Sequence, residues 1–131
     1  MSVHIRQATP SDSADCGRIC YEAFAAIATA HNFPPDLPDV GTAVGLLSML
    51  LGHEKFYGLV AEIDGRIVGS NFLDERGPIA GLGPITVDPH VQNKGIGWSL
   101  MSAAIEREER RGAVRATGVI AVNPSALYSA T

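Results

Sequence analysis

The sequence predicts a single α/β domain, equally describable as α+β, in which a mixed β-sheet is flanked by helices. Three observations predict this fold class. The chain has 131 residues, the length of one ordinary domain. Apolar residues alternate with a period of two in some segments and recur at helical spacing in others. Two extended runs flank Asp64-Gly65, a hairpin signal, and a later strand, helix and strand require a crossover.

The first part of the chain is predicted to form one strand and two helices. Residues 2–9 alternate apolar and polar side chains, which is typical of a short strand. A helix over residues 10–30 follows, with Thr9 as its cap and a proline in its first turn. Three prolines in residues 31–39 exclude a regular helix, so this segment is predicted as an ordered loop. A second helix, rich in Leu and Met, is predicted over residues 42–51.

The rest of the chain is predicted as a hairpin followed by a crossover. The hairpin strands span residues 57–63 and 66–74, and a third extended run covers residues 77–87. Two glycines and a proline interrupt that run, which predicts a bulge or a close backbone approach. A helix over residues 97–112 and a strand over residues 114–122 complete the order. The predicted apolar stripe of this last helix is Ile96, Leu100, Met101, Ala104 and Ile105.

Composition narrows the function classes. The formal net charge of −4 argues against a nucleic-acid-binding protein, which usually needs a basic face. No apolar run approaches the roughly 18 residues that a membrane span requires, and the N-terminus lacks a signal-peptide pattern. We therefore expect a cytoplasmic protein without a membrane contact. Cys16 and Cys20 are expected to be buried thiols, and the four scattered histidines predict no metal site.

The stretch "VDPHVQNKGIG", residues 87–97, starts a helix on two glycines. A P-loop is excluded because its two glycines five apart, followed by Lys and Ser or Thr, do not occur. A dinucleotide fingerprint fits poorly, since Leu100 stands where its third glycine would be. Two readings remain: a helix start whose free amides bind a diphosphate, or one that merely tolerates glycine.

A family resemblance favours the diphosphate-binding interpretation of this helix start. The pattern Gln92-x-x-Gly95-x-Gly97, placed after the run "ITVDP" of residues 85–89, resembles the acyl-CoA-binding motif of the GNAT superfamily of N-acetyltransferases. The opening "IRQATPSDSADCGRICYEAF" and the hairpin at Asp64-Gly65 also resemble that family. The similarity covers about residues 3–123. It implies the acyl-CoA N-acyltransferase fold, with a mixed, mostly antiparallel sheet, in one domain over residues 1–131.

The resemblance also implies acetyl-CoA as the co-substrate, without a metal. In this family the strand before the motif splays from its neighbour and pairs with the pantetheine arm, which assigns backbone contacts to Ile85, Thr86 and Val87. The pyrophosphate would lie on the amides of Gln92, Asn93, Lys94, Gly95, Ile96, Gly97 and Trp98. Asn123 is assigned to the cofactor site as well. The indole of Trp98 either covers the cofactor or packs beside the helix, and packing is the expectation.

Catalytic residues are less clearly marked. Members of the family often use a Tyr after the fifth strand as the acid for the leaving thiolate, and Tyr128 is the candidate. It arrives two residues earlier than in the family pattern, which is about 200° of rotation on a helix. Candidate bases are Asp74, Glu75, His90 and His31, and an ordered water chain is the alternative.

The predicted function is N-acetyl transfer from acetyl-CoA to a primary amine of a small molecule or peptide. Alternatives are a weakly active acyl-CoA-binding or sensing module and a structural domain without a ligand. The chain stops at Thr131, before the helix and two strands that normally end a GNAT domain. An uncovered sheet edge of this kind predicts either a homodimer through that edge or marginal stability.

Overall fold

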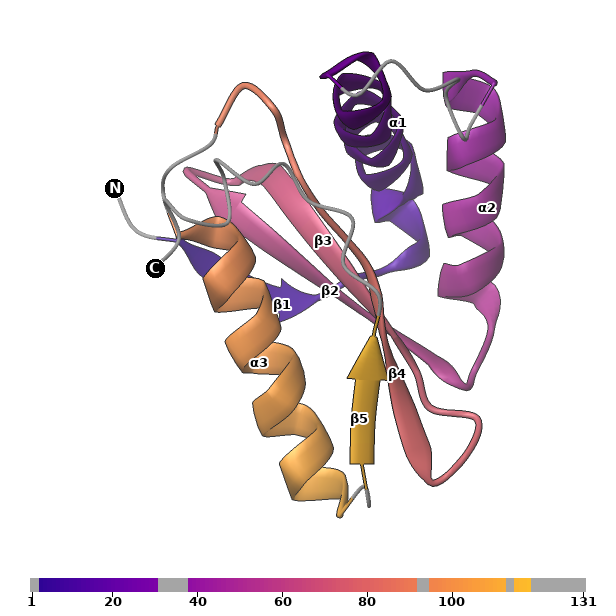
Figure 1. Cartoon of the computed structure of the whole chain (residues 1–131), viewed down its shortest axis with the longest axis vertical. Coiled ribbons are helices and arrows are strands. Elements are labelled where there is room, and N and C mark those ends of the chain that lie inside the picture. The colour runs from indigo at the N-terminus through magenta and orange to yellow at the C-terminus, as the bar shows by residue number, and fades with distance from the viewer. Residues whose placement is uncertain (1–2, 31–37, 92–94, 113–114, 119–131) are drawn as a thin grey trace.

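A computed structural model describes residues 3–30, 38–91, 95–112 and 115–118 (Figure 1). The elements follow the predicted order of strand, two helices, three strands, helix and strand. They are β1 (His4–Gln7), η1 (Pro10–Asp12), α1 (Ser13–Ala30), α2 (Val40–Gly52), β2 (Phe56–Ile63), β3 (Arg66–Asp74), β4 (Ile79–Val87), α3 (Ile96–Arg111) and β5 (Arg115–Gly118). The part of the predicted last strand beyond residue 118, and most of the proline loop, lie outside the described residues.

The five described strands form one sheet in the order β1-β2-β3-β4-β5. The first four pair antiparallel, as the hairpin and its neighbours require. Strand β5 pairs parallel to β4, because α3 carries the chain back across the sheet between them (Figure 1). The predicted mixed, mostly antiparallel sheet is therefore confirmed.

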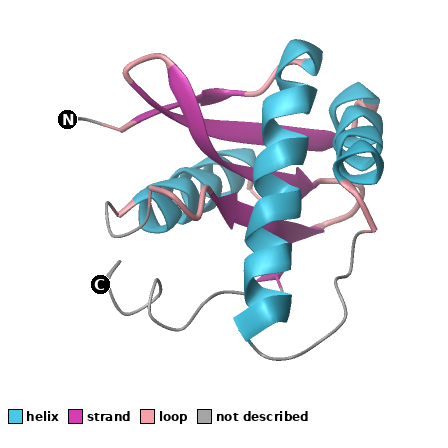
Figure 2. Ribbon diagram, turned by 90° about the horizontal axis from the view of Figure 1, so that it is seen from above, coloured by secondary structure: helices cyan, strands magenta, loops and turns pink. Residues whose placement is uncertain are grey.

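Helices cover both faces of the sheet (Figure 2), with α1 and α2 on one side and α3 on the other. Strand β3 lies at the centre and contributes side chains to both cores. Its pairing with β2 skips Val68, because Ala61 pairs with Gly69 and Glu62 pairs with Ile67, so the alternation of faces shifts by one residue there. Ile67 and Phe72 pack toward α1 and α2, whereas Val68 and Leu73 pack toward α3. Both faces of β3 are buried from Ile67 to Leu73, a stretch that includes the polar residues Ser70 and Asn71.

The hairpin between β2 and β3 is closed by the predicted pair. Asp64 has φ 55° and Gly65 has φ 78°, so both turn residues are in the left-handed region. That geometry matches the right-handed twist of the flanking strands, and it favours Asp and Gly at these positions. The predicted hairpin is confirmed, and β2 begins one residue earlier than expected, at Phe56.

The starts of the first two helices differ from the prediction. Residues from Pro10 form a separate 3₁₀ turn, because the Asp12 carboxylate turns back to accept the Thr9 N–H at 2.8 Å. Helix α2 begins at residue 40, two residues earlier than predicted, because Asp39 acts as its cap. The Asp39 carboxylate accepts the Thr42 N–H at 2.7 Å. Sequence reasoning overlooked this acidic cap.

The start of α3 rests directly on β3. A Cβ built on Gly69 would lie 3.0 Å from the Thr86 carbonyl oxygen, 3.1 Å from Leu100 Cδ1 and 3.2 Å from Ile96 Cγ2. Only a residue without a side chain leaves room for that approach. Gly69 therefore sets the height at which the first turns of α3 lie above the sheet.

Candidate functional site

Strand β4 carries the irregularity that the sequence predicted. Asn71 of β3 pairs with Ile85 of β4, yet Leu73 pairs with Leu82, so β4 contains one residue more than β3 over this interval. Gly83 lies inside the bulge with φ 128°, a conformation that strongly favours glycine. The described pairing of β4 with β5 ends at Leu82, on the N-terminal side of the bulge.

Asp88 shapes the turn that leaves β4. Its N–H continues the ladder by donating to the Val68 carbonyl at 2.8 Å, and its side chain is fully buried. One carboxylate oxygen, Oδ1, accepts the His90 N–H at 2.9 Å, and the Asp88 carbonyl accepts the Val91 N–H at 3.0 Å. Such a side-chain-to-backbone turn is the usual role of Asp before a change of direction.

Helix α3 then begins at a glycine cap. Gly95 is its cap, with φ 70°, and the Ser99 N–H donates to the Gly95 carbonyl at 3.0 Å. Within the described part of the chain, no acceptor lies within hydrogen-bonding distance of the N–H groups of Ile96, Gly97 or Trp98. These groups, together with the positive end of the helix dipole, favour an anion.

The two glycines leave space in front of those donors. A Cβ on Gly95 would meet no atom within 4 Å, and one on Gly97 would meet only Val87 Cγ2, at 3.9 Å. The end of β4 and the first turn of α3 are therefore adjacent, with no described side chain lying over Gly95. Residues of this kind fit a diphosphate, whose oxygens need close access to main-chain N–H groups.

Two side chains of α3 lie elsewhere than predicted. Trp98 is 62% exposed, so the expectation that its indole packs beside the helix is wrong. Ile105, assigned to the apolar stripe, is 43% exposed. The buried line is Ile96, Leu100, Ala104 and Glu108. Two members of this line, Ile96 and Leu100, lie directly over Gly69 of β3.

The carboxylates proposed as bases are engaged in ion pairs. Arg76 donates to both Asp74 oxygens, at 2.9 and 2.6 Å, and holds the pKa of Asp74 below its usual range. Burial opposes ionisation of Glu75, but two hydrogen bonds from Arg107, at 2.8 and 3.0 Å, hold its pKa below the usual range. A carboxylate with a lowered pKa is a poor proton acceptor near neutral pH.

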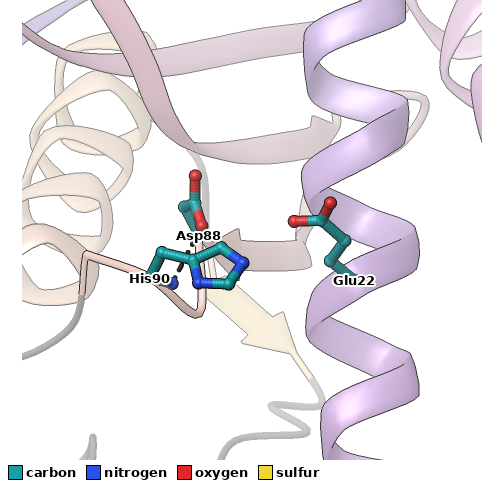
Figure 3. A group of neighbouring side chains, drawn as sticks. All are labelled: Glu22, Asp88 and His90. Carbon is teal, nitrogen blue, oxygen red and sulfur yellow. Dashed lines mark hydrogen bonds between the residues drawn. The ribbon is translucent and has the colours of Figure 1, made fainter.

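Three further side chains meet where α1 passes the end of β4 (Figure 3). Glu22 points toward Asp88 and His90, and their potential ligand atoms lie within 4.8 Å of one another. Arg18 contacts the same acids, with its Nη1 3.2 Å from Glu22 Oε2 and 3.8 Å from Asp88 Oδ2. This guanidinium already balances the two carboxylates. No sequence pattern indicates this cluster, because Glu22 lies far along the chain from Asp88 and His90. The absence of a metal remains a prediction.

The described residues of the predicted cofactor site thus lie next to one another, at the end of β4 and at the start of α3. Ile85, Thr86 and Val87 end β4 beyond the bulge, and Gly95, Ile96, Gly97 and Trp98 begin α3. The remaining predicted site residues lie outside the described residues: Gln92, Asn93, Lys94, Asn123, Tyr128 and the candidate base His31.

Comparison with known proteins agrees with this geometry. Residues 20–128 match the model of the acetyltransferase (GNAT) family. The chain belongs to the GNAT family. The resemblance found in the Gly95 and Gly97 motif is therefore confirmed at the level of the family. No curated protein matches this GNAT chain in a sequence comparison. None of the helices in the described ranges has the length and apolar character needed to cross a membrane.

Solved structures show the same fold at low sequence identity. A PaiA N-acetyltransferase from Thermoplasma acidophilum, solved with coenzyme A, superimposes with a TM-score of 0.74 at 18% identity, covering 86% of this chain and 76% of that one. A GNAT family acetyltransferase from Brucella melitensis, solved with acetyl-CoA, gives 0.70 at 23% identity, covering 93% and 77%. A ribosomal-protein-alanine N-acetyltransferase from Brucella melitensis biovar Abortus 2308 gives 0.66 at 18% identity, covering 95% and 84%.

Proposed function

We propose that this GNAT protein transfers an acetyl group from acetyl-CoA directly to a primary amine of a small molecule or peptide. One observation carries the proposal. Among the described residues, the N–H groups of Ile96, Gly97 and Trp98 have no hydrogen-bond acceptor, and they lie beside the end of a bulged strand. Membership of the family and two relatives solved with CoA or acetyl-CoA support the same co-substrate.

In this proposal the two halves of the site hold different parts of acetyl-CoA. The backbone of Ile85, Thr86 and Val87 pairs with the pantetheine arm on the side of β4 that faces away from β3. The amides of residues 92–98 hold the diphosphate, where Lys94 adds a positive charge, and Asn123 contributes to the same cofactor site. Backbone amides suit this role because they reach phosphate oxygens without a side-chain entropy cost.

The chemistry requires a proton acceptor, an oxyanion donor and a proton donor. The amine nitrogen attacks the thioester carbonyl carbon, the C–S bond breaks, and the amine loses one proton while the thiolate gains one. A backbone N–H of β4 near the bulge stabilises the oxyanion, and Tyr128 supplies the proton to sulfur. Because Asp74 and Glu75 are held in ion pairs, we assign deprotonation of the amine to a water chain.

Calorimetry with acetyl-CoA tests the proposal on Gly97→Glu. The new Cβ has room, since its nearest contact would be Val87 at 3.9 Å, so the variant should fold. Its carboxylate would stand where a phosphate is expected, and acetyl-CoA affinity should fall at least tenfold. The matched control is Gly45→Glu, an exposed glycine on α2 whose Cβ would meet nothing within 4 Å. Equal affinities for wild type and Gly97→Glu would refute the proposal.

A second candidate is a weakly active module that binds or senses acyl-CoA. The ion-paired state of Asp74 and Glu75 favours it, because it removes two candidate bases. Release of CoA thiol across a panel of amines separates the two functions. Turnover with any amine supports the transferase, and saturable acetyl-CoA binding without turnover supports the module. Sedimentation of the same samples tests the expected homodimer.

A further inference from the structure

The only tryptophan of the chain stands at the edge of the proposed diphosphate site. Trp98 is the third residue of α3 and is 62% exposed. Ile96 and Leu100, two positions on either side, are buried against the sheet. Trp98 therefore lies on the opposite face of the helix, and it belongs to neither core cluster. Most of its large apolar surface is therefore left uncovered in the described fold.

The geometry of a helix directs this side chain toward the open end of α3. Every Cα–Cβ bond in an α-helix leans toward the N-terminus, so a side chain covers the turn that precedes its own Cα. For Trp98 that turn contains Gly95 and Gly97, neither of which has a side chain to stand between the indole and a ligand. The indole thus borders the place where the N–H groups point.

We propose that the Trp98 indole stacks on the adenine ring of the CoA moiety. This inference rests on the proposed function, which places the diphosphate at the same helix start. In CoA a single ribose joins the diphosphate to the adenine, so the base lies within reach of a side chain beside the phosphates. A flat aromatic surface is what a nucleobase recognises, because stacking buries apolar area from both partners.

The alternative occupant of this face would be a second copy of the chain. Ile105 lies two turns further along the same side of α3 and is also exposed. The stripe does not continue, however, because exposed Glu106, Glu109 and Arg110 surround and follow it. Charged residues at the centre of a contact disfavour a helix-to-helix interface. A ligand confined to the first turn fits this distribution better than a protein partner.

Binding measurements with acetyl-CoA and its two halves test the inference. The halves are S-acetyl-4′-phosphopantetheine, which lacks the base, and adenosine 3′,5′-bisphosphate, which carries it. Trp98→Ala should weaken acetyl-CoA and the nucleotide by roughly fivefold to a hundredfold, the usual range for one stacked base, and leave the phosphopantetheine half unchanged. Trp98→Phe should restore most of the affinity. Ile105→Ala, an exposed apolar residue outside the site, is the control and should bind as wild type.

Fluorescence gives an independent readout, because all tryptophan emission comes from Trp98. Saturation with acetyl-CoA or the nucleotide should quench or shift it, whereas the phosphopantetheine half should not. Wild-type protein that fails to bind acetyl-CoA would refute the proposed function itself. Wild-type protein that binds acetyl-CoA with unchanged emission, or a Trp98→Ala variant that binds all three compounds as before or weakens them equally, would overturn the stacking alone.

Discussion

Gly17 of α1 and Val44 of α2 meet backbone to backbone. A Cβ built on Gly17 would lie 2.6 Å from Val44 Cα and 2.7 Å from Val44 N, well inside van der Waals contact. The two helices can approach this closely only because residue 17 has no side chain. This contact holds α2 against α1, and α1 in turn carries Arg18 and Glu22 to the end of β4.

Gly17→Ala should therefore destabilise the protein, although alanine is the better helix former. The added methyl must push α2 away, and overpacking of this kind costs about 1–3 kcal/mol. Urea unfolding measures the change. The control is Gly45→Ala on α2, where a Cβ meets nothing within 4 Å and helix propensity should add about 0.5–1 kcal/mol. Two variants of equal stability would contradict the close contact.

The Arg6–Asp12 pair predicts a specific acid sensitivity. Arg6 donates to both Asp12 oxygens, at 2.9 and 3.0 Å, and these bonds hold the pKa of the nearly buried Asp12 below its usual range. A lowered folded-state pKa contributes stability above the unfolded value of about 3.9, and that contribution is lost as the pH falls through the folded value.

Asp12→Asn should accordingly lower the free energy of unfolding at pH 7 and flatten its decline on acidification below about pH 4. Urea titrations at several pH values measure both effects. Asp15→Asn removes the same charge from an exposed position on α1, so it should leave the slope at low pH close to wild type. An Asp12 variant with the wild-type acid slope would show that this pair does not contribute.

The two cysteines should react very slowly with thiol reagents in the folded protein. Burial raises the pKa of Cys16 to about 12 and that of Cys20 to about 11, and both thiols are fully buried. The thiolate is the reactive form, so labelling by a disulfide reagent at pH 8 should proceed only as fast as the protein opens. In urea both should react at once. Rapid labelling under native conditions would mean that α1 is not packed as described.

Asp88 should act on acetyl-CoA binding by holding the turn that leads to α3. Asp88→Ala removes the acceptor of the His90 N–H, and we expect roughly a tenfold loss of acetyl-CoA affinity, which is the effect of about one hydrogen bond. Asp88→Asn is the matched control. It keeps an acceptor oxygen for the His90 N–H but, like Asp88→Ala, loses the ion pairs with Arg18 and Arg66. If the two variants bind equally well, the turn is not what positions the site.

Much of this protein could be predicted from short stretches of its sequence. Asp64-Gly65 specified the hairpin because both residues tolerate positive φ, and the period of apolar residues marked the helices and strands. Gly95 and Gly97 marked the helix start, and with Gln92 they carried the resemblance to the GNAT family. These features depend on backbone conformation and on neighbours within a few residues, which the local sequence determines.

Only the tertiary structure decided which side chains meet across the fold. It exposed Trp98 and Ile105, paired Glu75 with Arg107, and brought Arg18 and Glu22 to Asp88. A periodic pattern shows that a helix has an apolar side, but the exact line of burial depends on how closely another element approaches, as Gly69 does to α3. That approach is set by the packing of residues far apart in the chain, so it cannot be predicted from a short segment of the sequence.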